Sequence, residues 1–487
     1  MPNSGFQKTL VIHIVNALPK IKWPVLCRDS MMVKSTTDYP GICIWPRSLA
    51  WWWMMLLAFL GITVIEVEAQ PPNAKMNSLC ILKTGAVGDG ATMNTRALQT
   101  AIDQMADQGG GTVVVPPGQF LTGAIFLKPG VNLNLETNAV LLGSTNISDY
   151  PTMLTRIEGH TQMWRPALLN ADKCDHLEIT GNGTIQGGGK PFWNAFWQHY
   201  QADKTTKNLD VDRPRNIFIK DSKDVLISGI SLRDSGFWNL HLYRCQDLRV
   251  EQVDIRTPTH SPSTDGIDVD SCQRVTISGC YISVDDDDIA MKGTKGPLAD
   301  EDKDSPPVEH IRVYGCTFGL GHGVLTFGSE ACRVRDVVME NCRVEGVWAK
   351  DCLARLKLRP DTEQFYQNIH FRNITLSGKA ALVSIEPWMQ GFDLKGLTAP
   401  AQCVENVTFE NIQGEASSFG RIDGPAKSVV RGITFKDVDL NLANTNILMQ
   451  KVRDLKVENV HINGLLLTSN WGSPAGHPAK VESRNAN

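Results

Sequence analysis

A short sequence pattern occurs ten times along the chain and restricts its fold more than any other feature. Each copy has a turn residue, an aliphatic residue, a polar residue and a second aliphatic residue, as in 224–227 and 247–250. The first aliphatic residues of the copies are Leu177, Val225, Leu248, Val275, Ile311, Val337, Ile369, Val407, Ile433 and Leu455. Successive copies lie 48, 23, 27, 36, 26, 32, 38, 26 and 22 residues apart. We interpret the first step as a double interval and the other long steps as inserted loops.

This repeat predicts a stack of similar coils. Each unit is a pair of short strands with turn residues between them, and no long amphipathic helix interrupts the series, which argues against alternating strands and helices. A period in the twenties made of strands is typical of a solenoid, because one coil cannot bury its inward aliphatic residues without neighbours. We therefore predict an all-β fold, a single-stranded right-handed parallel β-helix.

One helix is expected before the repeat. Residues 94–108 place Ala97, Leu98, Ala101, Ile102 and Met105 at helical spacing. Three glycines at 109–111 follow, and glycine commonly ends a helix. We expect this short N-terminal helix to cap the open end of the solenoid.

The first 69 residues are predicted to lie outside the fold. An apolar run from Trp51 to Ile65 covers about 15 residues, fewer than the roughly 20 of a spanning helix. Arg47 precedes the run, and small residues end it at Ala69, which is the layout of a secretory signal cleaved before Gln70. The alternative is an uncleaved anchor. We predict an extension with a signal peptide at 1–69, a β-helix domain at 70–487, and secretion to an extracellular or periplasmic space without a membrane segment in the mature form.

Composition and cysteine spacing exclude several classes of protein. The chain has 48 Lys and Arg against 52 Asp and Glu, a net charge of -4, so it lacks the basic excess of a nucleic-acid binder. Ten of its 12 cysteines follow residue 69, without a Cys-x-x-Cys pair or a Cys/His cluster of metal spacing. We expect buried thiols stacked along the core, and neither a metal nor another cofactor.

Polar clusters recur in step with the coils. In a parallel β-helix, residues one coil apart lie side by side, about 4.8 Å from each other. From His241, the steps to Asp265, Asp286, His322 and Arg355 are 24, 21, 36 and 33 residues. The step of 36 contains a polar stretch at 293–307 that we interpret as an inserted loop. Five adjacent coils are thus predicted to present acids, imidazoles and cations on one face.

Strand alternation indicates which of these side chains point outward. Arg355 and Lys357 alternate with leucines, and so does His241, which places all three outside the coil. Strict alternation would turn Asp265 and Asp287 inward. They can reach the surface only if they precede the regular strand or lie at a bulge.

Carboxylates on one open face suit the cleavage of a glycosidic bond, in which one acid protonates the leaving oxygen and another activates water or attacks. Crowding in the run 285–288 should raise at least one pKa. Arg355 and Lys357 suit an anionic sugar. Taken alone, an Asp-rich turn is usually a solvated loop or a weak calcium site, and Gly-His-Gly is usually a turn. The shared register of the clusters favours a functional site.

These residues resemble the motifs of the polygalacturonase family, glycoside hydrolase family 28. That family carries Asn-Thr-Asp, Gly-Asp-Asp, Gly-His-Gly and Arg-Ile-Lys in this order on a right-handed parallel β-helix. The corresponding residues here are 263–265, 285–287, 321–323 and 355–357. The stretches 85–90 and 112–118 also resemble the start of pectinase β-helices, so the resemblance covers about residues 79 to 465.

The resemblance implies an inverting hydrolase that acts on α-1,4-linked galacturonate in a pectic polysaccharide or oligogalacturonide. By analogy, Asp286 is the general acid, and Asp265 and Asp287 activate water on the opposite face. His322 supports the acid or holds the sugar. No metal is implied, and a monomer is expected.

The resemblance also assigns the binding residues. Arg355 and Lys357 would hold a galacturonate carboxylate beside the cut. From its register alone, we add His241 as a substrate contact.

Departures from the family motifs leave the substrate open. Ser263 replaces Asn, Asp285 replaces Gly, Asp288 stands where many members have Cys, and 358–362 replaces a Gly-rich stretch. A rhamnogalacturonan or decorated pectin is therefore a second candidate substrate. Two rival functions are a calcium-dependent pectate lyase with Arg355 as the base, and a non-catalytic glycan-binding β-helix. The long 293–307 segment would favour attack on chain ends if it walls off one end of the cleft.

Overall fold

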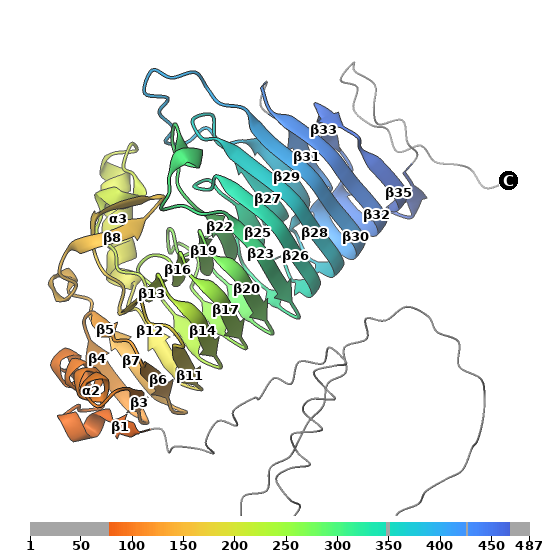
Figure 1. The fold of residues 1–487 in the computed structure, drawn as a ribbon. Helices are drawn as coiled ribbons and strands as arrows, with labels where there is room; N and C mark the ends of the chain where they lie inside the picture. Colours follow the sequence, from red (N-terminus) through yellow and green to blue (C-terminus); the bar gives the residue numbers. More distant parts are fainter. Residues whose placement is uncertain (1–76, 347–350, 425–426, 468–487) are drawn as a thin grey trace, which may run out of the picture. The chain divides into compact units, whose positions relative to one another are not determined.

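The computed structural model describes residues 77–346, 351–424 and 427–467. The predicted signal segment and the predicted boundary at residue 70 lie outside these residues. The described chain winds into a stack of coils whose strands run side by side along two parallel sheets (Figure 1). None of its described helices has the length and apolar character needed to cross a membrane.

Eleven strands of the described chain form the first sheet, each paired in parallel with the equivalent strand of the next coil. In order along the stack they are β5 (Ile125–Leu127), β10 (Leu169–Asp172), β13 (Ile217–Lys220), β16 (Leu240–Tyr243), β19 (Ile267–Asp270), β22 (Ile289–Lys292), β25 (Leu325–Phe327), β27 (Cys352–Leu358), β29 (Ala381–Pro387), β31 (Gly420–Asp423) and β33 (Leu448–Gln450).

The second sheet holds the repeat found in the sequence. Its main row is β1 (Ser78–Cys80), β3 (Gly111–Val115), β6 (Val131–Leu135), β11 (Glu178–Gly181), β14 (Lys223–Ser228), β17 (Gln246–Glu251), β20 (Gln273–Ser278), β23 (Val308–Tyr314), β26 (Arg333–Val344), β28 (Gln364–Ser377), β30 (Gln402–Ser418), β32 (Val429–Asn444), β34 (Val452–Arg453), β35 (Lys456–Ile462) and β36 (Leu465–Leu466). A second row of shorter strands extends it: β2 (Asp89–Met93), β4 (Gly118–Thr122), β7 (Ala139–Gly143), β12 (Thr184–Gln186), β15 (Ser231–Arg233), β18 (Asp254–Arg256), β21 (Tyr281–Ser283) and β24 (Thr317–Phe318).

The register of this sheet confirms the repeat. Val225 pairs with Leu248, Leu248 with Val275, and Val275 with Ile311. The pairing continues through Val337, Ile369, Val407 and Ile433. These aliphatic side chains are buried and form continuous rows inside the coils. The predicted parallel β-helix is therefore confirmed.

The turn residue of the repeat also has a structural cause. The residue before the first aliphatic position adopts a left-handed backbone, with φ of 56° at Asp224, 57° at Asp247 and 56° at Asn368. Asn and Asp tolerate this conformation better than most residues do. The pattern seen in the sequence therefore records one backbone bend in every coil.

The interpretation of the 48-residue step as a double interval is wrong. β11 pairs directly with β14, so a single coil separates them. The extra length contains the helix α3 (Lys190–Ala202) and the short helix η3 (Asn208–Asp210). The repeat did not predict α3, because its aromatic residues, with Phe192, Trp193 and Phe196 buried, do not follow the strand pattern.

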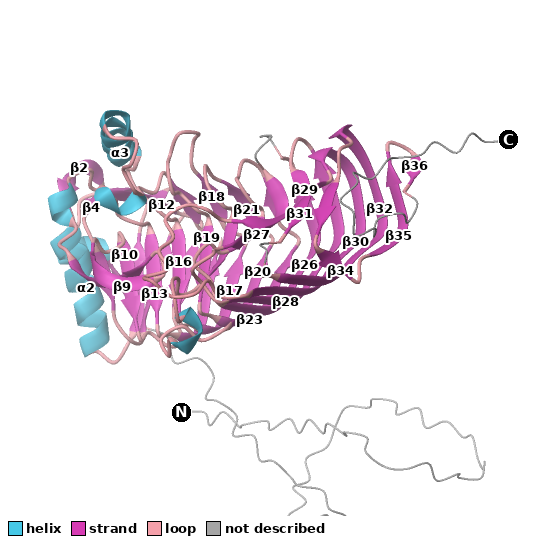
Figure 2. Cartoon of the chain, turned by 90° about the horizontal axis from the view of Figure 1, so that it is seen from above, coloured by secondary structure: helices cyan, strands magenta, loops and turns pink. Residues whose placement is uncertain are grey.

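The predicted capping helix is confirmed. α2 (Thr95–Asp107) lies at the end of the stack beside the first strands (Figure 2). Its buried face is formed by Leu98, Ala101, Ile102 and Met105. These apolar side chains cover the aliphatic residues of the first coil, which has no preceding coil to pack against.

Most of the cysteines are buried thiols, as expected from the sequence. Eight of the ten in the described chain are buried, and all ten carry free thiols. Equivalent thiols of adjacent coils meet, as where the Cys245 amide donates to the Cys272 sulfur at 3.3 Å.

Candidate active site

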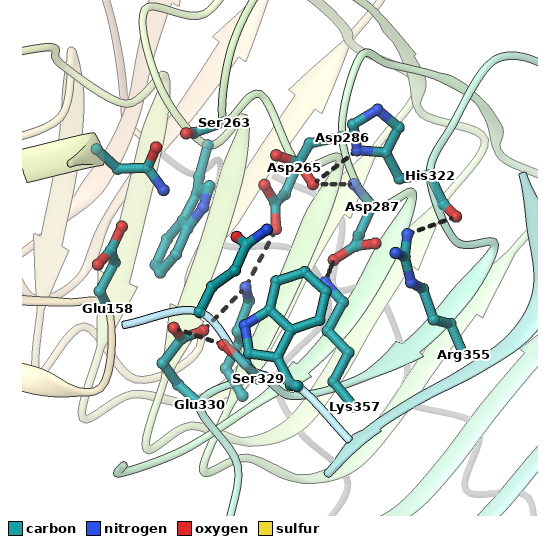
Figure 3. A pocket seen from close by; sticks show the side chains of 15 residues that line it. Glu158, Ser263, Asp265, Asp286, Asp287, His322, Ser329, Glu330, Arg355 and Lys357 are labelled. Carbon is teal, nitrogen blue, oxygen red and sulfur yellow. Dashed lines mark hydrogen bonds and ion pairs between the residues drawn. The ribbon is translucent and has the colours of Figure 1, made fainter. Parts of the chain in front are cut away.

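A pocket of about 560 Å³ opens beside the first sheet. It is lined by Glu158, Asn208, Trp238, Ser263, Asp265, Asp286, Asp287, Lys292, His322, Ser329, Glu330, Arg355, Lys357, Trp388 and Gln390. Six of the seven side chains proposed from the sequence are among them, and Figure 3 shows these six turned toward one another.

The acids reach the pocket because they precede the strands. β19 begins at Ile267 and β22 at Ile289, so Asp265 and Asp287 lie in the turns before them, where strict alternation does not apply. A Cβ atom at Gly266 would come within 2.4 Å of the Asp288 carbonyl oxygen of the next coil. Only glycine fits between the two turns, and this brings their acids close together.

The structure does not bring His241 into the pocket. His241 pairs with Asp268 rather than with the Asp265 turn, and the row continues through Ala290, Thr326 and Arg355. The expected substrate contact at His241 is therefore wrong.

His241 is covered by neighbouring side chains. It points away from the coil interior as expected, but its exposed fraction is 0%. Its Nδ1 lies 2.6 Å from a nitrogen of Arg215 and its Nε2 lies 3.3 Å from Asp270. Burial lowers its pKa to about 3, so the ring is neutral. Alternation predicts which way a side chain points, but not what later folds over it.

The three pocket acids form one cluster. One oxygen of each of Asp265, Asp286 and Asp287 lies within 4.8 Å of the others. Lys357 donates to Asp287 at 2.5 Å, and Lys292 lies 3.2 Å from Asp265. Each of these two acids therefore has a lysine partner, whereas the nearest charged partner of Asp286 is a histidine.

That histidine is His322. Its Nδ1 lies 3.5 Å from Asp286 Oδ1, and the Asp287 amide donates to the same oxygen at 3.0 Å. His322 stands in the turn before β25, one coil beyond the two acids, as the register of the coils predicts.

Burial and charge give the cluster distinct pKa values. Burial raises the pKa of Asp265 to about 7, although the Lys292 ammonium opposes this shift. Burial alone would also raise the pKa of Asp286, but His322 and Lys357 outweigh it and lower this pKa below its usual value. The Asp286 carboxylate in turn outweighs the burial of His322 and raises its pKa. The ligand-free cluster thus holds a proton near neutral pH, mainly on Asp265.

Burial, rather than crowding, is the main cause of the raised values in the four-aspartate run. It raises the pKa of Asp285 and, more strongly, that of Asp288. Neither residue lines the pocket. The expectation of a raised pKa is correct in direction, but its largest physical cause is different.

The same cluster is poorly suited to a cation. Its three oxygens are close enough to share one, but ammonium groups already lie 2.5 Å from Asp287 and 3.2 Å from Asp265. A bound cation would be repelled by both lysines. The arrangement fits proton transfer better than the ligation of calcium that a lyase would need.

Two cations and a tryptophan line the pocket beside the acids. Arg355 and Lys357 project from β27, and Arg355 donates to the His322 carbonyl oxygen at 3.0 Å. The Lys357 ammonium lies 4.8 Å and the Arg355 guanidinium 5.7 Å from the centre of the Trp388 ring. A flat aromatic surface beside two cations suits a sugar ring that carries a carboxylate.

Sequence reasoning missed the far end of the pocket. Glu158 and Glu330 line it together with Lys292, and Lys295 lies 3.3 Å from Glu158 and 3.5 Å from Glu330. Lys292 had a detectable signal, because it ends the strand that follows the aspartate run. Glu158 had none, since it lies outside the coil repeat.

Glu158 belongs to an inserted hairpin, β8 (Met153–Ile157) and β9 (His160–Trp164). The hairpin turn residue Gly159 lies close to Gly293. A Cβ atom added at Gly159 would be 3.0 Å from the Gly293 carbonyl oxygen. The hairpin tip therefore packs directly on the segment that begins the 293–307 insertion.

One buried ion pair and several buried hydrogen bonds hold this hairpin against the coils. Arg156 lies 2.9 Å from Asp270 and donates to Thr294 at 3.1 Å. Arg215 donates to the Arg156 carbonyl oxygen at 2.8 Å and to Thr155 at 2.9 Å. The hairpin is thus fixed to both the first sheet and the 293–307 segment.

Comparison with known proteins identifies the fold and the family. The sequence pattern of Glycosyl hydrolases family 28 matches residues 108–463, which is most of the chain. The chain belongs to this family. The predicted resemblance to glycoside hydrolase family 28 is confirmed, and the protein is a glycoside hydrolase.

Relatives and solved structures agree with this assignment. An exopolygalacturonase of Zea mays is 28% identical over 399 residues, covering 78% of this chain and 87% of the relative. A probable polygalacturonase of Vitis vinifera is 27% identical over 402 residues, covering 77% of each chain. In three dimensions, the crystal structure of an exopolygalacturonase from Thermotoga maritima matches with a TM-score of 0.65 at 23% identity, over 82% of this chain and 94% of that one.

Proposed function

We propose that this family 28 member hydrolyses α-1,4-galacturonosidic bonds of polygalacturonate. The observation that carries the proposal is the pocket in which the acid cluster faces Arg355, Lys357 and Trp388. Acids supply the proton transfers of hydrolysis, and the two cations complement a uronate carboxylate. The names of the relatives, polygalacturonase and exopolygalacturonase, support the same substrate class.

In the proposed reaction, Asp286 gives its proton to the glycosidic oxygen as the bond from that oxygen to the anomeric carbon breaks. A water molecule held by Asp265 and Asp287 bonds to the anomeric carbon and gives up a proton to the cluster. His322 positions Asp286. Arg355 and Lys357 hold the uronate carboxylate.

Substrate binding would move the proton to Asp286. In the free site, His322 and Lys357 keep the pKa of Asp286 low while Asp265 holds the proton. A substrate carboxylate beside Lys357 offsets that positive charge, so the pKa of Asp286 rises when the sugar binds. Asp286 would thus be protonated, and able to act as the general acid, only when a uronate occupies the pocket.

The stereochemical outcome is a separate part of the proposal. The family resemblance implies inversion, whereas the closest oxygens of the three acids lie within 4.8 Å, less than the roughly 6.5–9.5 Å between the carboxyls of many inverting enzymes. We propose inversion with water held between Asp265 and Asp287. Proton NMR of the first product resolves the anomers, and a first product of retained configuration would contradict this assignment.

The activity is tested by the release of reducing sugar from polygalacturonate. Asp286→Asn should lower kcat by about 10² to 10⁴, the range for loss of an essential general acid. Asp285→Asn is the matched control, because Asp285 belongs to the same aspartate run but does not line the pocket. Equal activity of Asp286→Asn and the control would refute the proposed acid, and activity on rhamnogalacturonan alone would refute the proposed substrate.

We propose further that the enzyme acts on chain ends. The hairpin tip at Glu158 and Gly159 lies against the 293–307 segment, and this contact supports a pocket that is closed at one end. A polymer could then enter only by its terminus. Relatives named exopolygalacturonase are consistent with this mode.

The products from a ladder of oligogalacturonides test this mode. The wild type should release one short product from the start of the reaction. Replacing 153–164 with a short Gly-Ser linker should yield fragments of intermediate size, with folding checked by thermal unfolding. Intermediate fragments from the wild type would contradict action on chain ends.

Export and oligomeric state stay as predictions. We propose that 51–69 directs secretion, where a pectic polymer would be encountered, and that the enzyme is a monomer. N-terminal sequencing of the secreted protein would give the cleavage site, which we expect before Gln70.

A further inference from the structure

A buried carboxyl lies behind the acid cluster, and the proposed mechanism does not use it. Asp268, in the middle of β19, has an exposed fraction of 0%. Neither of its oxygens accepts a hydrogen bond from a donor in the described chain. Lys292 approaches at 3.6 Å, but the same ammonium lies closer to Asp265, at 3.2 Å, and to Glu330, at 3.5 Å.

Charged and titratable groups surround Asp268 on every side. They are Asp265 in the preceding turn, Lys292 on β22, Asp287 in the turn before β22, His241 on β16, and Arg215 before β13. The ring nitrogens of His241 are engaged by Arg215 and Asp270. Arg215 directs its terminal nitrogens to His241, Thr155 and the Arg156 carbonyl oxygen. The imidazole and the two terminal nitrogens of the guanidinium thus contact other partners, and Arg215 Nε, like the Asp268 oxygens, makes no hydrogen bond in the described chain.

A carboxylate anion would be costly at this position. Burying an ionised group without hydrogen-bond donors is unfavourable, and such a group takes up a proton instead. Burial together with the charge of Asp265 raises the pKa of Asp268 well above its usual value, in agreement with this geometry. A protonated carboxyl is a donor, and the side chain of Asp265 lies within hydrogen-bonding reach of Asp268 and can accept this bond.

We propose that Asp268 is a positioning residue whose protonated carboxyl donates a hydrogen bond to Asp265 and holds that acid in orientation for the water molecule. The inference rests on the proposed function of Asp265. It adds a neutral acid behind the reacting acids, so that Lys292 balances the charges of Asp265 and Glu330 rather than those of three carboxylates.

Two substitutions separate the donor from the charge. Asp268→Asn keeps a donor of the same shape, so kcat should stay within a few fold of the wild type, and the pH profile of kcat/KM should not move. Asp268→Leu removes the donor. It should lower kcat by about 10–100-fold, the loss typical when a partner that orients a metal ligand is removed, which we take as the scale for a partner that orients an acid. It should also move the alkaline limb of the profile to higher pH, because an ionised Asp265 is then less stabilised.

A shift of the alkaline limb to lower pH in Asp268→Asn would overturn the proposal. If Asp268 is an anion, Asp268→Asn removes a negative charge beside Asp265 and moves the alkaline limb to lower pH. Asp254→Asn, an acid on β18 outside the pocket, is the control that should leave the profile in place. Thermal unfolding of each variant shows whether it is folded.

A second readout needs no substrate. The infrared difference spectrum between the wild type and Asp268→Asn should show the band of a protonated carboxyl at a pH where the wild type is folded. If that band is present while polygalacturonate is not cleaved, the proposed function fails and the proton on Asp268 stands. If only carboxylate bands differ, the proposal about Asp268 fails.

Discussion

At the scale of single residues, the site is an acid cluster whose proton is held by burial. Asp265 has a pKa of about 7, while the pKa of Asp286 is lowered by His322 and Lys357. Because the acids are coupled, the apparent pKa values belong to the cluster rather than to one residue. The sequence could suggest a raised pKa from crowding, but only coordinates show that burial is its main cause.

A pH dependence follows from the proton of the cluster. Hydrolysis needs that proton, which is held below pH 7 and lost above it. We expect kcat/KM on polygalacturonate to fall above pH about 7, approaching tenfold per pH unit, while activity persists into mildly acidic solution. Initial rates across buffers of constant ionic strength would measure this limb. A rate that rises through pH 7 would contradict the assignment of the proton.

The sequence also predicted most, but not all, of the side chains that meet in the pocket. The order and spacing of the motifs identified Asp265, His322 and Lys357, because coil register is a property of spacing. The prediction that His241 contacts substrate was wrong, because the side chains of Arg215 and Asp270 that cover it come from other coils.

At the scale of elements, the β8–β9 hairpin contributes Glu158 to the lining of the pocket. It does not belong to the coil repeat, and neither its alternation nor its length predicts where it docks. Its position depends on buried polar contacts, chiefly the pair of Arg156 with Asp270, whose side chains are 3% and 1% exposed. Such contacts join residues more than 100 positions apart and leave no local pattern in the sequence.

Removing one member of this pair should destabilise the protein. Arg156→Ala leaves the Asp270 carboxylate buried without its main cation, and we expect a loss of about 3–5 kcal/mol in the free energy of unfolding. Arg256→Ala is the control, because its pair with Asp254 is largely exposed and should contribute about 0–1 kcal/mol. Denaturant titration of both variants measures the difference. Equal losses would show that the hairpin does not depend on the buried pair.

At the scale of the whole molecule, the fold can be predicted from the sequence because the same pattern of turn and aliphatic residues recurs in every coil. Ten copies of one pattern give a register that the structure reproduces pair by pair. Insertions interrupt the pattern without disturbing it, as α3 does between β11 and β14. The repeat therefore predicts the scaffold, whereas the inserted segments that add Glu158 and Asn208 to the pocket must be seen in three dimensions.

The stacked core gives a prediction at this scale. Phe371, Phe409 and Phe435 stack in successive coils with ring centres 5.0 Å apart. Phe409→Ala should cost about 3–5 kcal/mol of stability. The specific activity of the folded protein should be unchanged, because Phe409 is buried in the core and does not line the pocket.

The exposed Phe392→Ala is the control for this substitution, with an expected change within about 0.5 kcal/mol. Denaturant midpoints and activity below the transition measure both properties. A loss of activity that matches the loss of stability in Phe409→Ala would show that the coils communicate over a longer range.

The packing of the β8–β9 hairpin on the 293–307 segment has a consequence for how a polymer would be degraded. Under the proposed mode, turnover depends on the molar concentration of termini and not on the mass of polysaccharide. A solution of long chains would keep its viscosity while monomer slowly accumulates. A second enzyme that cuts the polymer at random within its chains would create new termini. It would therefore increase the rate of the chain-end enzyme without any contact between the two proteins.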